Sequence, residues 1–383
     1  MRETGFQGER GLRAACGGGF QGMPEGAKHA VAPHAHGYGK RVSPGAKAKE
    51  GFMKVAVIGA GSWGTALAHV LGTAGHDAML WARKQEVCDG INGSHRNPRY
   101  LVNEPVPARV RASSRYDEVL SGAEAVVVVT PSSILRQVAR DIAPHIDGCV
   151  PIAICSKGVE AQTGRLPVEI FEEEAGNRAR IAALTGPNHA EEVIRGIASG
   201  TVIASENADT ARFFQELFAT EAFRTYVSDD IVGAEVCAAF KNVIAIAVGA
   251  AYGFGLGDNT AALIMTRGLA EMSRLVEACG GTPMTCMGLA GVGDLIATCT
   301  SEHSRNRTFG YRMAQGVTLE QYKAETHMVV EGALACKTLG ALAEAHDVEL
   351  PITEMVRSVL WEGADPRSAA ASLFDRSLKP EFY

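Results

Sequence analysis

The sequence contains no stretch of roughly 18 uninterrupted apolar residues, the length that a membrane-spanning helix requires. Its most apolar segment, VIAIAVGAA at 243–251, directly follows Lys241 and Asn242, so we expect no membrane span. An excess of basic charge is also lacking, because 37 Lys and Arg residues stand against 43 Asp and Glu residues, for a formal net charge of −6. Nucleic-acid-binding proteins normally carry a basic domain or stripe, so we expect no nucleic-acid partner.

Cysteine pairs are absent as well. The nine cysteines are scattered along the 383 residues, and no two of them form a CxxC pair. Disulfide scaffolds and structural zinc sites need closer, paired spacing, so we expect neither of them and no metal ligand set. Reduced thiols are typical of a cytoplasmic protein, and we expect that location.

Residues 1–52 have little from which a core could form. They hold 12 glycines, but only Leu12, Val31 and Val42 from the Leu, Ile and Val group. Such a segment buries too little apolar surface to offset the ordering of its backbone, and it lacks the apolar core of a secretory signal. We expect a disordered or non-native extension, with Met53 as a candidate start of translation; a transit peptide is the alternative.

From Met53 onward the chain has the strand, glycine turn and helix that are typical of dinucleotide binding. A β-forming run at 55–58 is followed at once by GAGSWG and then by a helical apolar face over 65–74. In this pattern Gly59 permits the tight turn, Gly61 lets the backbone approach a pyrophosphate, and Gly64 allows close packing of helix on strand. The helix N-terminus then attracts the phosphates.

The end of the next strand bears on the choice of cofactor. NAD-preferring sites usually have an acidic residue there that binds the ribose hydroxyls, whereas this chain reads Trp81-Ala82-Arg83-Lys84. Arg83 could pair with a 2′-phosphate, so we expect NADP(H), with NAD(H) as a second cofactor. The alternative is that Arg83 is only a solvated loop charge.

Further β-branched runs recur at the spacing of an α/β domain, at 125–130, 151–156, 181–185, 201–205 and 223–227. Ser132, Lys157 and Gly186 each follow the end of one of these runs. Because ligands of doubly wound sheets bind outside the carboxyl ends of the strands, we expect these residues near one crevice.

After Asp229-Asp230 the pattern changes to long helical stretches without a convincing strand. We therefore expect an α/β fold in which a Rossmann-type doubly wound sheet at 53–230 is followed by an all-helical substrate and catalytic domain at 231–383.

Lys241 is the first candidate for chemistry. If its segment is helical, the residues one turn away on either side are Cys237, Ala238, Ile244 and Ala245, all of them apolar. Apolar surroundings lower the pKa of a lysine towards neutrality, as a general acid or base requires. The alternative is a lysine that extends from a partly buried helix to water. Asn242 could orient the site or be an ordinary core amide.

A second candidate region is GLAGVGDLIATCTSEHSRNRTFG at 288–310. Arg305 and Asn306 beside the hydroxyl of Ser304 would make a phosphate clamp, because a phosphate accepts several charge-assisted hydrogen bonds. The alternative is a solvated basic loop. Asp294 could pair with Lys241 or cap a helix.

The sequence blocks of residues 53–370 closely resemble those of the bacterial NAD(P)-dependent glycerol-3-phosphate dehydrogenases. In chain order they read VAVIGAGSWGTALA, LWARK, VVVVTPS, SKG, GPNHAEE, KNVIAI, TRGLAEMSRL, AGVGDL, SRNR, VVEG and LPITE. The resemblance implies reversible hydride transfer between NAD(P)H and C2 of dihydroxyacetone phosphate, which gives sn-glycerol 3-phosphate for phospholipid synthesis. It also makes a homodimer plausible.

By motif position, the resemblance implies that Lys241 is the proton donor and acceptor and that Asp294 and Thr298 support it. The residues that it implies for binding the substrate are Lys157, Gly186, Asn188, Lys241, Asp294, Ser304, Arg305 and Asn306. Those that it implies for binding the cofactor, together with the three loop glycines, are Ser62, Trp63, Arg83, Lys157, Ala190, Arg305, Val329 and Glu331. Many family members have a small hydroxyl residue and an aromatic residue where this chain has Asn188-His189, and His189 is not our choice of base.

Two other functions compete with this one. A dehydrogenase of the β-hydroxyacid type would share a Lys–Asn helix but act on a carboxylate, and SRNR at the expected phosphate position argues against it. A non-catalytic nucleotide sensor would keep the glycine loop without the chemistry. The joint presence of Lys241, Asn242, Asp294 and Arg305 argues against a sensor.

Overall fold

The structure, a computed structural model, describes residues 51–326, 329–372 and 380–381. All of these residues belong to one compact unit. The expected N-terminal extension lies outside the described residues, apart from Gly51 and Phe52.

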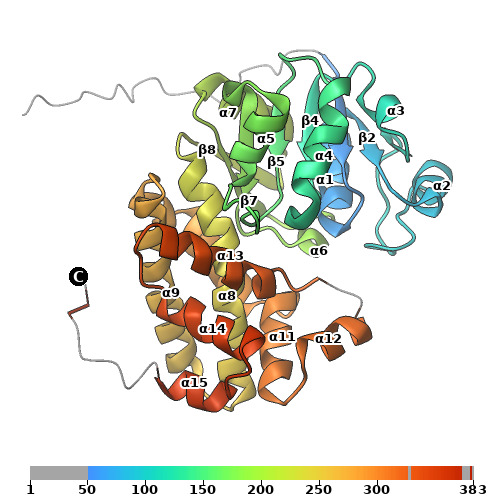
Figure 1. The fold of residues 1–383 in the computed structure, drawn as a ribbon. Coiled ribbons are helices and arrows are strands. Elements are labelled where there is room, and N and C mark those ends of the chain that lie inside the picture. Colours follow the sequence, from blue (N-terminus) through green and yellow to red (C-terminus); the bar gives the residue numbers. More distant parts are fainter. Residues whose placement is uncertain (1–50, 327–328, 373–379, 382–383) are drawn as a thin grey trace, which may run out of the picture. The chain divides into compact units, whose positions relative to one another are not determined.

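An eight-stranded sheet occupies the first half of the described chain (Figure 1). The strands are β1 (Lys54–Ile58), β2 (Asp77–Trp81), β3 (Val110–Ser113), β4 (Ala125–Val128), β5 (Ile152–Ile154), β6 (Ile181–Thr185), β7 (Ser199–Ala204) and β8 (Phe223–Ser228). Their order is β3-β2-β1-β4-β5-β6-β7-β8, and every pair is parallel except β6 with β7. The doubly wound sheet is confirmed; the sequence did not predict the short strand β3.

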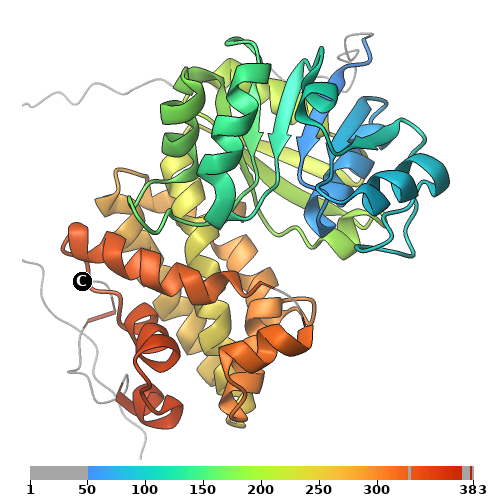
Figure 2. The ribbon, with the colours of Figure 1, turned by 45° about the vertical axis from the view of Figure 1, so that its right-hand side comes forward.

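Helices cover both faces of this sheet (Figure 2). They are α1 (Ser62–Thr73), α2 (Gln85–Ser94), α3 (Tyr116–Leu120), α4 (Leu135–Ile142), α5 (Pro167–Ala175), α6 (Ala190–Val193) and α7 (Ala208–Phe218). Side chains alternate between the faces, so Ile58 packs in the same core as α4 and α5 while Val57 packs with α1, α2 and α7. Burial on both faces explains why the central strands are almost entirely apolar.

The second half is helical among the described residues. Its helices are α8 (Ile231–Gly253), α9 (Asp258–Ala278), α10 (Asp294–Thr300), α11 (Arg305–Ala314), α12 (Leu319–Thr326), α13 (Glu331–Ala345), α14 (Pro351–Trp361) and α15 (Pro366–Ser372). Asp230 caps α8, since its side chain accepts a hydrogen bond from the backbone N–H of Gly233. The all-helical part that the sequence predicted after the sheet is therefore confirmed.

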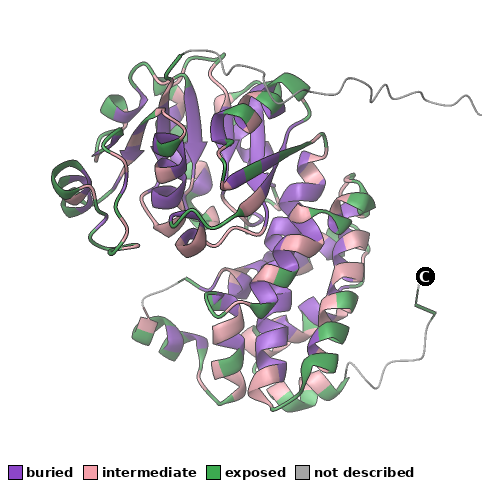
Figure 3. Cartoon of the chain, turned by 180° about the vertical axis from the view of Figure 1, so that it is seen from behind, coloured by how far each residue is buried: buried purple, intermediate pink, exposed green. Residues whose placement is uncertain are grey.

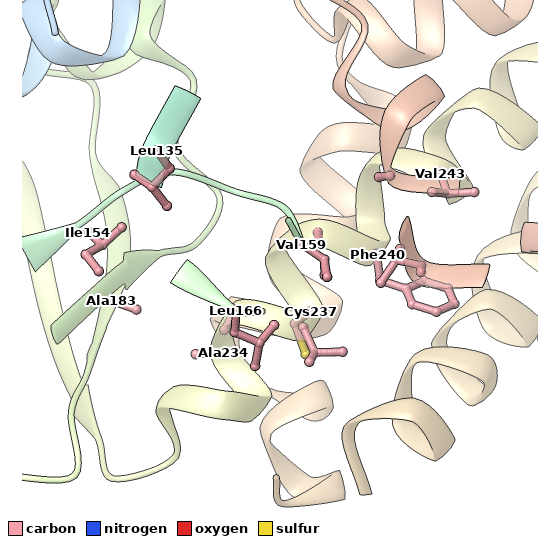
Figure 4. Packing of buried hydrophobic residues seen from close by; sticks show 14 of the residues in the cluster. Leu135, Ile154, Val159, Leu166, Ala183, Ala234, Cys237, Phe240 and Val243 are labelled. Atoms are coloured by element: carbon pink, nitrogen blue, oxygen red, sulfur yellow. The ribbon is translucent and has the colours of Figure 1, made fainter. Parts of the chain in front are cut away.

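Helix α8 is the centre of this half (Figure 3). By length and composition alone it could cross a membrane, but 94% of its most apolar window is buried inside the protein, as in the core helix of a globular protein. Its first turns also pack beneath the sheet, where Ala234, Cys237 and Phe240 share one core with Ile154 and Ala183 (Figure 4). This shared core holds the middle of α8, and with it Lys241, next to the residues that follow the strands.

Candidate active site

Three side chains from two helices form a buried polar group around Lys241. The Lys241 Nζ lies 2.5 Å from Asp294 Oδ1 and 2.9 Å from Thr298 Oγ1. Asp294 is the first residue of α10 and follows a π-helical turn at Leu289–Gly293, and Thr298 lies one turn further along the same helix. Thr298 also donates its hydroxyl proton to the Asp294 carbonyl at 2.6 Å. The structure thus brings together the lysine, carboxylate and hydroxyl that we expected to act together.

A second lysine binds the same carboxylate from the sheet side. Lys157 follows β5 by three residues, and its Nζ lies 2.9 Å from Asp294 Oδ2. Each oxygen of Asp294 therefore binds one ammonium group, and Asp294 itself is 2% exposed. The sequence predicted both lysines for the site but not this contact, which joins the sheet half of the chain to the helical half.

The three charges shift one another's ionisation. Burial lowers the pKa of Lys241 to about 8; the Asp294 carboxylate opposes this shift, and the nearby Lys157 ammonium adds to it. Burial alone would also lower the pKa of Lys157, but the attraction of Asp294 outweighs burial and raises it. Burial opposes the ionisation of Asp294, yet the two ammonium groups outweigh it and hold its pKa below the ordinary value. Lys241 is thus the group of the three that can exchange a proton near neutral pH.

A chain of amides links Lys241's neighbour to two other helices. Asn306 Nδ2 donates to Asn242 Oδ1 at 2.9 Å, and Asn306 Oδ1 accepts from Gly332 N at 2.9 Å. Asn242 Nδ2 in turn lies 3.3 Å from Glu331 Oε2, at the first turn of α13. These contacts join α11 and α13 to α8 through Asn242, and an orienting role for this amide remains a prediction.

The expected phosphate clamp lies at the start of α11. Ser304 is the N-cap, and its hydroxyl oxygen accepts from Arg307 N at 3.3 Å, while Asn306 is 7% exposed. Arg305, the first residue of the helix, is exposed. The residues expected to form the clamp therefore comprise a buried amide, a capping hydroxyl and an exposed guanidinium at one helix N-terminus, where the helix dipole favours an anion.

The glycine turn has the geometry that a dinucleotide needs. Gly59 has a φ of +123°, and a Cβ on it would lie 2.6 Å from Val129 O; one on Gly64 would lie 1.8 Å from Gly59 O. A Cβ on Gly61, in contrast, would meet no atom within 4 Å. Helix α1 begins there without a side-chain cap or an acidic residue in its first turn, so its N–H groups and the space beside Gly61 fit a pyrophosphate.

Other residues predicted for the site are Gly186, Asn188, Ala190 and Trp63. Gly186 has a φ of +152°, and Asn188 donates from Nδ2 to Gly200 O at 2.9 Å, while its buried Oδ1 has no partner among the described residues. Ala190 begins α6, and Trp63 packs against Phe223.

Three residues expected to bind ligands are exposed: Arg83, Arg305 and Val329. Among the described residues, no hydrogen bond or ion pair joins Arg83 or Arg305 to the Lys241–Asp294 pair. Their side chains remain available to a ligand, and their roles remain predictions.

Sequence reasoning missed two contacts near the site. His189 Nε2 lies 3.2 Å from Ala297 O, so the loop after β6 contacts α10 beside Thr298. Asn97 is fully buried, and its side chain bonds to the glycine turn. His189 lies in the block GPNHAEE, but nothing in that block indicates a contact with α10, and Asn97 lies in none of the blocks singled out above.

Comparisons with known proteins agree with this geometry. The family described as NAD-dependent glycerol-3-phosphate dehydrogenase N-terminus matches residues 54–211, and the family described as its C-terminus matches residues 230–371. The glycerol-3-phosphate dehydrogenase (NAD(P)+) of Shouchella clausii is 42% identical over 332 residues, which are 86% of this chain and 98% of the relative. That of Corynebacterium urealyticum is 44% identical over 331 residues, or 86% of this chain and 100% of the relative. The crystal structure of glycerol-3-phosphate dehydrogenase from Coxiella burnetii matches with a TM-score of 0.81 and 36% identity, covering 85% of this chain and 99% of that one.

Proposed function

This chain belongs to the NAD-dependent glycerol-3-phosphate dehydrogenase family, and from that premise we propose how its own residues carry out the reaction. It is an NAD(P)-dependent oxidoreductase that reduces dihydroxyacetone phosphate to glycerol 3-phosphate and catalyses the reverse oxidation. The bound cofactor supplies or accepts the hydride. The chain must bind and orient both ligands and move the proton.

We assign the proton to Lys241. In reduction, its ammonium group donates a proton to the substrate's C2 oxygen as negative charge develops there; in oxidation, the neutral amine takes that proton back. A pKa of about 8 lets one residue serve both directions near neutral pH. Asp294 and Thr298 hold the Nζ in place, and the shared, buried Asp294 is the observation that carries this proposal.

Binding of the substrate phosphate is assigned to Arg305, with Ser304 and Asn306 beside it. An exposed guanidinium at a helix N-terminus can form charge-assisted hydrogen bonds without first breaking an internal ion pair. Lys157, Gly186 and Asn188 are assigned to the other side of the substrate, since they follow β5 and β6.

The cofactor is assigned to the glycine turn and to the residues at the ends of the neighbouring strands. Ser62, Trp63 and Gly64 supply backbone N–H groups at the first turn of α1. Arg83, exposed two residues after β2, is assigned to a 2′-phosphate, to which its guanidinium would donate hydrogen bonds, and this assignment favours NADP(H) over NAD(H). Contacts from Lys157, Ala190, Arg305, Val329 and Glu331 complete the set, as the family resemblance implies.

Several broader features belong to the same proposal. Residues 53–230 form the dinucleotide-binding domain and residues 231–383 form the substrate and catalytic domain, although each ligand also contacts residues of the other domain. Two copies form a homodimer. The product feeds phospholipid synthesis, and we assign the enzyme to the cytoplasm because its nine scattered cysteines include no CxxC pair.

A substrate panel tests the activity directly. Oxidation of NADPH and NADH, followed by the loss of nicotinamide absorbance, should require dihydroxyacetone phosphate and be far slower with unphosphorylated dihydroxyacetone. Equal rates for the two triose forms would exclude the phosphate clamp. Activity with a keto acid instead would indicate a dehydrogenase of the β-hydroxyacid type.

A further inference from the structure

Asn97 has the most complete set of side-chain hydrogen bonds near the glycine turn. It is 0% exposed and lies in the segment between α2 and β3. Its Nδ2 donates to Ala60 O at 3.0 Å and to Thr65 Oγ1 at 2.8 Å. Its Oδ1 accepts from Arg99 N at 3.0 Å and from Tyr100 N at 3.2 Å. Both donors and both acceptor positions of the amide are thus used.

The segment that carries Asn97 is a closed loop. An isolated antiparallel bridge joins Arg96 to Pro105, and the guanidinium of Arg96 donates to Asn103 O at 2.5 Å. Residues 96–105 therefore have their ends held together, as in compact Ω-loops. Asn97 lies just inside this closure, where it fixes the loop through its contacts with the N–H groups of Arg99 and Tyr100.

The loop and the residues that follow it run along one face of α1. Asn97 contacts Thr65, Pro105 O lies 3.1 Å from His69 Nδ1, and Pro107 lies beside Gly72. The contacted residues of α1 are four and then three positions apart, which is the spacing of a single helix face. Asn97 meets this face at its N-terminal end, where the glycine turn enters the helix.

The contact with Ala60 O determines how the glycine turn is oriented. In a trans peptide the C=O and the following N–H point in opposite directions. By holding the carbonyl of Ala60, Asn97 therefore turns the N–H of Gly61 away from itself. Among the described residues, Gly61 N donates no backbone hydrogen bond, and a Cβ on Gly61 would meet no atom within 4 Å, so this part of the turn has a free donor and open space for a ligand.

We propose that Asn97 is a positioning residue for the dinucleotide: it ties the 96–105 loop to the glycine turn and holds the turn in the conformation that binds the pyrophosphate. The inference rests on the proposed function, in which that turn binds NAD(P)H. Asn97 acts through Ala60 and Thr65 and does not contact the reacting atoms, so its loss affects cofactor binding and leaves proton transfer at Lys241 intact.

The test compares Asn97→Ala with Asn103→Ala, which removes an exposed asparagine from the same loop. We expect Asn97→Ala to raise the Kd and the KM for NADPH about five- to tenfold, the loss expected for one net hydrogen bond. At saturating cofactor, the KM for dihydroxyacetone phosphate and kcat should stay within about twofold of the wild type. Asn103→Ala should match the wild type in all of these values. An unchanged Kd for NADPH in folded Asn97→Ala would overturn the proposal.

Thr65→Val keeps the proposal testable if Asn97→Ala fails to fold. It removes the hydroxyl that accepts from Asn97 but preserves the shape of the side chain, and we expect a rise of about two- to fivefold in the KM for NADPH. If Asn97→Ala folds, the double variant should bind NADPH no more weakly than Asn97→Ala alone, because both changes remove the same tether. An unchanged KM in folded Thr65→Val, or effects that multiply in the double variant, would contradict the tether.

The two possible failures can be told apart. If the wild type binds neither NADPH nor NADH, the proposed function fails. If the wild type binds NADPH and the variants bind it equally well, only the positioning role of Asn97 fails.

Discussion

At the scale of single residues, the site depends on one carboxylate shared by two ammonium groups. An isolated buried carboxylate or ammonium is costly, because the protein interior solvates charge poorly. Asp294 with Lys157 and Lys241 offsets this cost and leaves one net positive charge in the group. A substrate whose C2 oxygen gains negative charge during reduction meets that positive charge, so the group favours the transition state over the ketone.

The first prediction concerns the proton donor. Lys241→Ala should lower kcat for reduction about 10²- to 10⁴-fold, the range expected when a positioned general acid is removed. The Kd for NADPH should change little, because the glycine turn does not contact Lys241. Steady-state kinetics and fluorescence titration of NADPH would measure the two effects. Lys323→Ala, which removes an exposed lysine from α12, is the control; a kcat near that of the wild type in Lys241→Ala would remove the assignment.

The second prediction concerns the phosphate. Arg305→Ala should raise the KM for dihydroxyacetone phosphate about 10- to 100-fold, as expected for the loss of charge-assisted hydrogen bonds to a dianion. At saturating NADPH, which compensates for the cofactor contact also assigned to Arg305, the weak activity with unphosphorylated dihydroxyacetone should be unchanged. Arg312→Ala removes a partly exposed arginine from the same helix, whose guanidinium pairs with Glu325, and should leave both values unaffected. Equal losses with the two substrates would show that Arg305 has another task.

At the scale of helices and strands, the elements that local patterns define could be predicted from the sequence. The glycine turn, the strands at 125–130 and 181–185, and the apolar helix around Lys241 all follow from spacing within about 20 residues. Strand β3 was missed because its four residues, VRAS, alternate with only two buried positions and include the exposed Arg111. The π-helical turn before Asp294 was missed too, since its hydrogen bonds depend on packing.

The contacts within the site were harder to predict than the identities of its residues. Lys157 and Asp294 are 137 residues apart, and a single sequence carries no signal that links their side chains. The resemblance to known dehydrogenases supplied the members of the site, whereas the pairing comes from how α8 and α10 pack below the sheet. Asn97 had neither a motif nor a periodic pattern, so only the folded chain shows its four hydrogen bonds.

Two buried glutamates hold the N-termini of other helices. Glu235 on α8 accepts from Val168 N in the first turn of α5, and Glu271 on α9 accepts from Ile352 N at 2.7 Å in the first turn of α14. Burial raises the pKa of Glu235 to about 8 and that of Glu271 to about 7, with the backbone hydrogen bonds opposing both shifts. These carboxyls therefore gain charge in the folded protein only near or above neutral pH.

The third prediction follows from Glu271. In the unfolded chain its carboxyl ionises near its ordinary pKa of 4.5, but in the folded protein only near 7. Its contribution to stability is therefore fully present below pH 4.5 and is lost as the pH rises through 7, by an amount of order 1–3 kcal/mol.

The variant Glu271→Gln tests this pH dependence. It keeps an oxygen for Ile352 N but cannot ionise, so its Tm should fall less than that of the wild type between pH 5 and pH 8. Thermal unfolding across this range, with the exposed Glu344→Gln as control, measures the difference. If Tm changed with pH in the same way in Glu271→Gln and in the wild type, Glu271 would not be the source of this pH dependence.

At the scale of the whole molecule, the two halves meet at α10 as well as at the first turns of α8. Lys157 reaches Asp294 from the end of β5, and His189 reaches Ala297 from the loop after β6. Both contacts are made by residues that follow strands, and both are received by the helix that holds Lys241 in place. The proton donor belongs to the helical half, but its charge environment is completed by the half that carries the glycine turn. Changing a residue of the sheet half should therefore alter the titration of Lys241.

The last prediction tests that dependence through the pH profile. The Lys157 ammonium contributes to the lowered pKa of Lys241, so Lys157→Met should let that pKa rise from about 8 towards the ordinary value of 10.5. Reduction needs protonated Lys241 and slows as the pH rises through its pKa, so the falling limb of kcat should move to higher pH in Lys157→Met. Oxidation needs the neutral amine, so its rising limb should move in the same direction.

The maximal rate of Lys157→Met can fall as well, because Lys157 is assigned to ligand binding. The loss of that contact alone would change the height of the pH profile and not its position. The control is Lys337→Met, which removes an exposed lysine on α13 and should leave both limbs in place. Limbs that stay in place in Lys157→Met, or that move to lower pH, would show that Lys241 titrates independently of the sheet half.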